Sequence, residues 1–281
     1  MADRRLATRR LNGGGGEGTL LFLHATGLNA STYVPLLQDV GFDGEVLAPS
    51  LRGHGATVLP ADPKTLRDWR GLAQDVVADH IACGGGKPLI MAGHSAGAVT
   101  ALLAAKELRP RKLLLIEPVI LPRLYVNLAA TPLRRWTTDR IPIAQAAARR
   151  RDVFPSRQEA EENYRQKPFF AGWDERALTA YLDEGLEVDD TGEVRLACTP
   201  AFEAAMFRAQ SHGFWPHVKY VLKQGTEVSV LAAAERTVTP PFAQKRLRRL
   251  GAEVTVMQGG HMLPLERPAE VATWLRDRTG V

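Results

Sequence analysis

Cysteines and long apolar runs are scarce in this sequence, and each scarcity excludes a class of protein. Only two cysteines occur among 281 residues, Cys83 and Cys198, and they lie far apart without metal-ligand spacing. They favour neither a disulfide framework nor a zinc site, so we expect two free thiols. No segment reaches the roughly 18 uninterrupted apolar residues of a membrane span, and no apolar stretch behind the N-terminal arginines is long enough for a signal peptide. We therefore expect a cytoplasmic protein that does not associate with membranes.

Positive charge is in excess, but it is not concentrated in one region. The formal net charge is +5, and the arginines occur in short groups along the whole chain, such as Arg149, Arg150 and Arg151. A nucleic-acid surface would gather such residues beside aromatics, so we expect solvated helix faces and no nucleic-acid partner. The sequence also has no metal, nucleotide or flavin motif, and we expect no cofactor and no metal site. Nothing in it indicates an oligomeric state.

Short apolar runs alternate with longer segments of helical spacing. The runs cover residues 18–24, 44–49, 88–93, 112–118, 227–234 and 252–258. Runs of this length bounded by Gly or Pro are typical of strands buried on both faces of a parallel sheet. The helical segments cover residues 66–83, 96–108 and 239–250. The alternation predicts an α/β fold around a mostly parallel, doubly wound sheet.

Residues 121–216 interrupt this alternation. They contain several prolines and aromatics, have no strong buried strand, and are expected to form irregular helices. Because the alternation resumes afterwards, we expect a helical cap inserted into a core made of residues 1–120 and 217–281. Trp136 and Phe170 of this segment are candidate residues of an apolar substrate pocket, although such aromatics can equally form the cap's own small core.

A candidate nucleophile lies between the predicted strand at 88–93 and the helical segment at 96–108. Residues 93–97 read GHSAG, which fits the G-x-S-x-G turn in which the serine has a strained backbone and the helix N-terminus points amides at the reacting oxygen. Gly93 and Gly97 are needed because a side chain at either position would collide with the neighbouring strand and helix. The pattern predicts Ser95 as a nucleophile.

With this motif the chain resembles the α/β-hydrolase family over nearly all of its length, and within it the bacterial esterase-like hydrolases with a helical cap. The matching segments are LFLHATG, LRGHGAT, GHSAG and GGHMLPLERP, in the order and at the separations typical of the family. The resemblance implies the α/β-hydrolase fold, a catalytic triad and acyl transfer to the serine.

His261 is the candidate general base. It follows the last predicted strand, so a neutral imidazole there could reach back to Ser95, take its proton and return it to the leaving group. His54 is expected to stabilise a loop. His94 adjoins the nucleophile, and although its side chain is expected to point away, it is a candidate pocket residue together with His24.

The resemblance also implies an oxyanion hole. In the family it combines the amide that follows the nucleophile with an amide from a loop after an early strand. In this chain the first position is Ala96, and the loop is residues 24–27, where Thr26 is the expected donor and Ala25 its neighbour. Ala25 stands where the family usually has glycine.

The acid of the triad is missing from the family's usual position. That position follows the penultimate strand and is filled here by Thr237, which cannot carry the charge that stabilises an imidazolium. Glu117 ends the strand next to the nucleophile strand, where its carboxylate would open on the same crevice. One branch of haloalkane dehalogenases resembles this arrangement. We therefore predict Glu117 as the acid, with Glu235 or a broken triad as the alternatives.

Ser95, His261 and Glu117 together predict hydrolysis of a small ester-like substrate through an acyl-enzyme, with Ala96 and Thr26 at the oxyanion. Two alternatives stay open. The same triad could support carbon–carbon bond hydrolysis or perhydrolysis, or the chain could be a ligand receptor or pseudoenzyme that keeps the pocket but turns over little. A serine nucleophile argues against dehalogenase or epoxide hydrolase chemistry, for which resembling relatives use aspartate.

Overall fold

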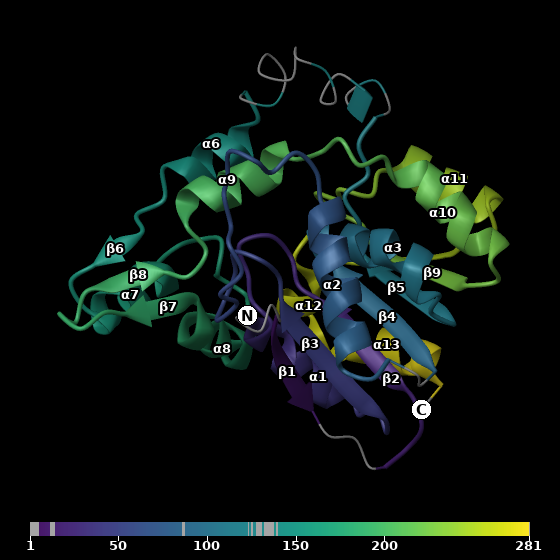
Figure 1. The fold of residues 1–281 in the computed structure, drawn as a ribbon, viewed down its shortest axis with the longest axis horizontal. Helices are drawn as coiled ribbons and strands as arrows, with labels where there is room; N and C mark the ends of the chain where they lie inside the picture. Colours follow the sequence, from purple (N-terminus) through teal and green to yellow (C-terminus); the bar gives the residue numbers. More distant parts are fainter. Residues whose placement is uncertain are drawn as a thin grey trace.

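A seven-stranded sheet forms the centre of the molecule (Figure 1). The computed structural model describes residues 6–11, 15–85, 88–122, 124, 126–127, 131, 138 and 140–280. The strand order is β1-β3-β2-β4-β5-β9-β10, and all neighbours are parallel except β1 and β3. The strands are β1 (Ala7–Leu11), β2 (Thr19–Leu23), β3 (Glu45–Ser50), β4 (Leu89–His94), β5 (Lys112–Ile116), β9 (Glu227–Ala233) and β10 (Glu253–Met257). The mostly parallel sheet predicted from the sequence is confirmed.

The central strands are buried on both faces, as their apolar runs predicted. Every residue of β2 and β4 is buried, and so is all of β9 after its first residue. β1 was not predicted. It pairs antiparallel with β3 at the sheet edge, where Arg9 and Arg10 are exposed. The strand therefore lacks the run of apolar residues from which the other strands were predicted.

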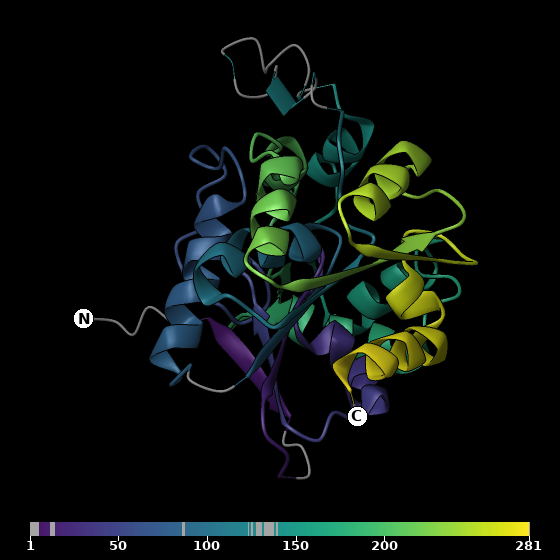
Figure 2. The ribbon, with the colours of Figure 1, turned by 90° about the vertical axis from the view of Figure 1, so that its right-hand side faces the viewer.

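Helices cover both faces of the sheet, and the view in Figure 2 places the blue α2 and the yellow α13 on opposite sides. The helices that pack in one core cluster are α2 (Arg70–Ala82), α3 (Ala96–Leu108), α10 (Phe214–Lys223) and α11 (Pro241–Arg249). The other cluster contains α1 (Val34–Val40), α12 (Leu263–Glu266) and α13 (Pro268–Thr279). This two-layer covering explains why the central strands carry apolar residues at successive positions.

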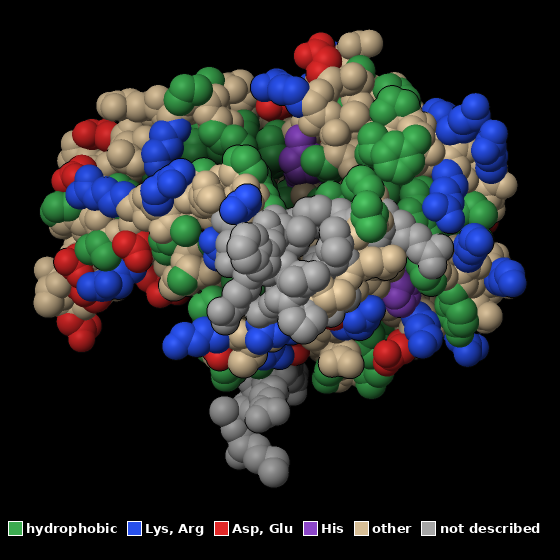
Figure 3. All heavy atoms as spheres, turned by 90° about the horizontal axis from the view of Figure 1, so that it is seen from above, with side chains coloured by type: hydrophobic (Ala, Val, Ile, Leu, Met, Phe, Trp, Pro, Cys, Tyr) green, Lys and Arg blue, Asp and Glu red, His purple; other side chains and the backbone are tan. Residues whose placement is uncertain are grey.

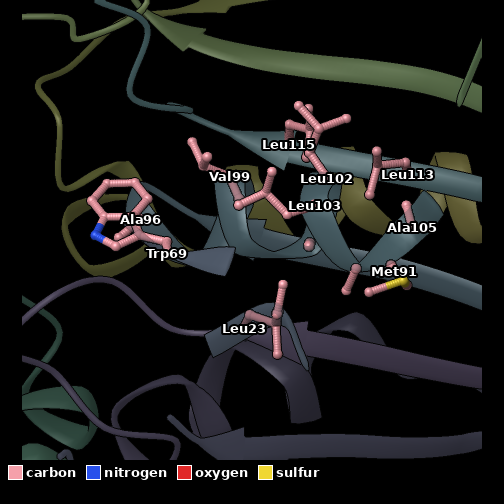
Figure 4. Packing of buried hydrophobic residues seen from close by; sticks show 14 of the residues in the cluster. Leu23, Trp69, Met91, Ala96, Val99, Leu102, Leu103, Ala105, Leu113 and Leu115 are labelled. Atoms are coloured by element: carbon pink, nitrogen blue, oxygen red, sulfur yellow. The ribbon is translucent and has the colours of Figure 1, made fainter. Parts of the chain in front are cut away.

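Helix α3 is the most deeply buried helix in these layers. Its first ten residues are all buried, and Val99, Leu102 and Leu103 lie against the strand residues Met91 and Leu115 (Figure 4). A helix packed on this scale gains roughly 25 cal/mol for each Å² of apolar surface removed from water. The residue at its N-terminus, Ser95, is therefore held by the core itself.

The chain between β5 and β9 contains more than helices. It forms α6 (Pro142–Ala148), α7 (Arg157–Arg165), α8 (Glu175–Gly185) and α9 (Pro200–Arg208), together with a three-stranded antiparallel sheet of β6 (Val153–Phe154), β7 (Leu186–Val188) and β8 (Val194–Leu196). The small sheet contradicts the expectation of helices alone. Its strands have two or three residues each, which is too short to show a period in the sequence.

This segment is packed against the core and has an aromatic cluster of its own. α8 contacts the short helix η1 (Ser31–Tyr33) and α1, and α6 lies beside α9 (Figure 1). Phe170 stacks on Tyr181 with ring centroids 5.6 Å apart, and both are buried. No helix among the described residues is both long and apolar enough to cross a bilayer.

Candidate active site

Ser95 occupies a strained turn between β4 and α3. Its φ of 56° and ψ of −116° lie in a region that side chains rarely adopt, and its N–H donates to the carbonyl of Ile116 on the neighbouring strand at 2.9 Å. A Cβ at Gly93 would lie 2.6 Å from the backbone of Gly97, and one at Gly97 would overlap the carbonyl oxygens of Leu23 and His24. The two glycines therefore let three chain segments meet at Ser95.

We expect Gly97→Ala to destabilise the fold by about 3 kcal/mol or more, because the added methyl meets backbone that cannot move aside. Urea-induced unfolding measures the loss. The matched control is Gly71→Ala on α2, where nothing lies within 4 Å of the new methyl. That change should leave stability equal or raise it by roughly 0.5–1 kcal/mol. Equal stability of the two variants would contradict the close approach at Gly97.

In the predicted triad, His261 lies within hydrogen-bond distance of both Ser95 and Glu117. His261 Nε2 is 3.0 Å from Ser95 Oγ, and His261 Nδ1 is 3.1 Å from Glu117 Oε2. The side chain of His261 is 27% exposed, while that of Glu117 is completely buried. A neutral imidazole fits this arrangement if Nδ1–H donates to the carboxylate and Nε2 accepts from the serine hydroxyl.

Glu117 is held by four donors. Its Oε1 accepts from the N–H of Ala233 at 2.8 Å and from the hydroxyl of Thr237 at 2.5 Å, and its Oε2 accepts from the N–H of Val238 at 3.0 Å as well as from His261. Since a buried charge is tolerated only when hydrogen-bonded, these contacts suit an ionised carboxylate. Thr237, at the family's usual aspartate position, supports the acid instead of replacing it.

Glu235 does not reach the imidazole. Its side chain is exposed, and its N–H donates to the carbonyl of Gly259. Of the two acids that the sequence left open, the structure brings only Glu117 next to His261.

The amides expected at the oxyanion hole differ in how they are engaged. In the 24–27 loop, the N–H of Ala25 donates to Tyr33 Oη at 3.3 Å and that of Gly27 donates to His54 Nε2 at 3.1 Å. Between them, the N–H of Thr26 has no acceptor among the described residues. Ala96, in the first turn of α3, also has an amide that the helix leaves free. Ala25, expected beside the donor, therefore has an amide that is engaged elsewhere. The available amides are those of Thr26, which lines the same cavity as Ser95, and of Ala96, which follows Ser95 in the chain.

A buried chain of hydrogen bonds links the oxyanion loop to the loop that carries His261. Ala25 donates to Tyr33 Oη, Tyr33 Oη lies 2.7 Å from His94 Nδ1, and His94 Nε2 lies 2.8 Å from the carbonyl oxygen of His261. Because that carbonyl can only accept, Nε2 of His94 carries the proton and Nδ1 accepts from the tyrosine hydroxyl. His94 thus holds the backbone of His261.

The candidate pocket residues His24 and His94 are corrected, because neither lines the cavity and both side chains are buried. For His94, the sequence itself leads us to expect a side chain that points away. His24 Nε2 accepts from the N–H of Leu51 at 2.8 Å, and His54 bonds the oxyanion loop as a loop-stabilising residue should. Burial lowers the pKa of His24 to about 4. Burial together with the charge of His24 lowers the pKa of His54 to about 3. Both rings therefore remain neutral acceptors near neutral pH.

A cavity of about 310 Å³ opens above Ser95 and His261. In the view from above, hydrophobic side chains surround a histidine in a hollow of the surface, with lysine or arginine side chains beside it (Figure 3). Of the two candidate aromatics, Phe170 lines the cavity, while Trp136 lies outside the described residues. A larger hollow of about 880 Å³ lies at α9 and contains none of the triad.

Charged residues that the sequence did not single out also line the cavity. Arg150 pairs with Glu203 and donates to the hydroxyls of Tyr164 at 2.6 Å and Tyr181 at 3.1 Å. Lys167 lies nearby with Nζ 4.4 Å from the centroid of the Tyr164 ring. Arg150 is the middle one of three consecutive arginines that follow the end of α6, and it is the one that lines the cavity. Within the described part of the chain, no group of three or more His, Cys, Asp or Glu side chains is arranged to hold a metal ion.

Comparisons with known proteins agree with this architecture. The sequence matches the alpha/beta hydrolase family over residues 20–274. No curated protein matches it significantly. The chain is similar in fold to the peroxisomal alpha-beta-hydrolase Lpx1 from Saccharomyces cerevisiae, with 20% identity and a TM-score of 0.74 over 93% of this chain and 75% of that one.

Two further solved structures are similar over nearly their whole length. E-2-(acetamidomethylene)succinate hydrolase has 19% identity and a TM-score of 0.72, over 99% of this chain and 100% of that one. A thermophilic esterase from Thermogutta terrifontis has 17% identity and a TM-score of 0.64, over 96% and 92%. At such identities the likeness shows the shared fold alone. Because the family match covers most of the sequence and the sheet has the same architecture, the chain belongs to the alpha/beta hydrolase family.

Proposed function

We propose that this protein is a serine hydrolase that cleaves a carboxylic ester, or a related acyl bond, through an acyl-enzyme. The observation that carries the proposal is the hydrogen-bonded chain from Glu117 through His261 to Ser95 at the floor of a cavity. A nucleophile, a base and an orienting acid in this order are the requirements of acyl transfer.

In the first half-reaction Ser95 Oγ attacks the substrate carbonyl. His261 Nε2 takes the hydroxyl proton, and Glu117 stabilises the imidazolium that forms, since its carboxylate already accepts from Nδ1. The negative oxygen would be bound by the amides of Thr26 and Ala96. One such donor is typically worth on the order of 10²–10³ in rate. The imidazolium then protonates the leaving alcohol.

In the second half-reaction water attacks the acyl-enzyme. His261 accepts a proton from the water and returns it to Ser95 Oγ as the acid product leaves. The free enzyme is restored in its starting protonation state. His261 therefore serves first as base and then as acid in each half-reaction. The partial exposure of His261 leaves a path for this water.

The segment 121–216 is proposed to act as a cap that shapes the acyl or alkoxy pocket. Its residues Ile143, Phe169, Phe170 and Phe207 line the cavity over Ser95. Apolar walls around a few polar groups are typical of small-molecule sites. The esterase among the similar structures supports ester cleavage only through the fold that the two chains share.

A 4-nitrophenyl ester tests the proposal. A hydrolase should release nitrophenol repeatedly after an initial burst, and a fluorophosphonate probe should label Ser95. Release of at most one equivalent per chain would favour a receptor or pseudoenzyme. Turnover of a carbon–carbon substrate in preference to every ester would assign the same triad to that bond instead.

Tyr33→Phe should lower kcat, because it breaks the buried chain that joins the oxyanion loop to the backbone of His261. Small misplacements of reacting groups cost on the order of tenfold to hundredfold in rate. Steady-state kinetics on one ester measures the effect. The control is Tyr220→Phe on α10, whose ring packs under Lys106 and does not line the cavity. Unchanged kcat in Tyr33→Phe would show that the two loops hold their places independently.

A further inference from the structure

Among the described residues, two cationic side chains and one carboxylate line the cavity above Ser95. They belong to Arg150, Lys167 and Glu203. Arg150 and Glu203 are paired directly, so their charges offset each other. The remaining positive charge is that of Lys167.

Lys167 has no carboxylate within ion-pair distance among the residues that the structure describes. The acids of the preceding helix α7 are engaged elsewhere. Glu159 pairs with Arg151 and Glu161 pairs with Arg157, while Glu162 accepts from the side-chain amide of Gln158 at 2.8 Å. The α8 acid Glu175 likewise pairs with Arg165. The nearby carboxylates therefore bind other residues, and Lys167 lines the cavity with a charge that no carboxylate in the described part of the chain pairs with.

The surroundings make this ammonium group responsive to an anion. Its Nζ lies over the Tyr164 ring, which removes water from one side of the charge. Burial lowers the pKa of Lys167, the charge of Arg150 lowers it further, and the carboxylate of Glu203 acts in the opposite direction. An anion bound here would pair with the ammonium group and so offset both the cost of its burial and its repulsion from Arg150.

Two tyrosine hydroxyls near the cation accept hydrogen bonds from Arg150, and each still has its own O–H to donate to an anion. They belong to Tyr164 and Tyr181, whose rings form part of the cavity wall. The rest of the lining is largely apolar, including Leu28, Ile143 and Phe207. A substrate that fits this lining has an apolar middle and one charged end.

We propose that the hydrolase takes esters that carry a carboxylate remote from the scissile bond, and that Lys167 binds this carboxylate. The inference rests on the ester hydrolysis proposed above and specifies its substrate class. A cavity of about 310 Å³ is near the lower end of the roughly 300–1,000 Å³ typical of small-molecule sites, so short substrates such as monoesters of small dicarboxylic acids fit best.

Matched pairs of esters test the specificity. Monomethyl glutarate is compared with its neutral counterpart methyl 4-carbamoylbutanoate, and 3-acetoxypropanoate is compared with 3-acetoxypropanamide. The pairs place the charge on the acyl side or the alcohol side of the ester. In at least one pair the parent should favour the anion in kcat/KM by about tenfold or more, and Lys167→Met should lower that ratio roughly tenfold to hundredfold.

Two variants serve as references. Lys167→Arg keeps the charge and should retain most of the preference, whereas Lys223→Met removes an exposed charge at the end of α10 and should leave the ratio unchanged. The preference should also weaken as salt is added, since a partly exposed ion pair is screened. No preference for the anion in either pair, or a preference that survives Lys167→Met, would overturn the inference.

Binding of glutarate separates this inference from the hydrolytic function. Calorimetry should detect glutarate binding to the parent and to Ser95→Ala alike, and weaker binding to Lys167→Met. If no ester is turned over but this pattern holds, the hydrolytic proposal is wrong while the anion site stands. If neutral esters are turned over but Lys167→Met binds glutarate as the parent does, the anion site is wrong while the hydrolase stands.

Discussion

Ser95→Ala should lower ester turnover by about 10⁶, the scale at which loss of a triad serine is felt. The serine supplies the attacking oxygen, and no other hydroxyl lies within reach of His261 Nε2 in the described structure. The small serine side chain makes few packing contacts, so the unfolding midpoint of Ser95→Ala should stay close to that of the parent. Single-turnover kinetics with a 4-nitrophenyl ester measures the loss.

Ser211→Ala is a suitable control for this experiment, because that hydroxyl donates to the backbone carbonyl of Arg67 and neither residue lines the cavity. It should be labelled by a fluorophosphonate as the parent is, whereas Ser95→Ala should remain unlabelled. Turnover in Ser95→Ala above about one thousandth of the parent would remove Ser95 from the role of nucleophile.

Glu117→Gln should lower turnover on the order of ten-thousandfold, as an acid-to-amide change does in a serine protease triad. The amide can accept at one oxygen only, so its NH₂ group faces donors that the carboxylate satisfied, such as the N–H of Ala233 or Val238. A stability loss of about 1–3 kcal/mol should accompany the kinetic effect. Turnover is therefore compared below the unfolding transition of both proteins.

Relocating the acid distinguishes charge from packing. Thr237 already contacts Glu117, so Thr237→Asp in the Glu117→Gln background places a carboxylate beside the same imidazole and should restore part of the turnover. Glu235→Gln is the control, since that side chain is exposed, and it should change turnover by less than about tenfold. Near-parent activity of Glu117→Gln together with a large loss in Glu235→Gln would transfer the acid to Glu235.

The parts of the fold that a sequence predicts well are those whose burial is repeated along the chain. β4 and β5 are apolar at successive positions because both of their faces are covered, and this pattern can be read directly. β1 has one exposed edge and two exposed arginines, so its pairing with β3 depends on a partner nearly forty residues away. Such pairing is tertiary information that no local pattern carries.

The same limit applies to the site. The turn at Ser95 and the position of His261 follow from short motifs with strict backbone requirements, and Glu117 followed from the missing aspartate. Arg150 and Lys167 have no comparable signal, because a cation on an irregular helical segment is normally solvated. Their role in the cavity depends on how that segment lies over the core.

The hydrogen bond from Thr237 to Glu117 also bears on how the catalytic acid can move from one strand end to another during evolution. A chain with acids at both positions would hold two carboxylates against one imidazole. Like charges so close cannot both ionise, so one would keep its proton and donate the hydrogen bond that Thr237 donates now. The imidazole would still face a single negative charge. An ancestor could thus acquire the second acid first and lose the original afterwards, with an ionised partner for His261 at each step.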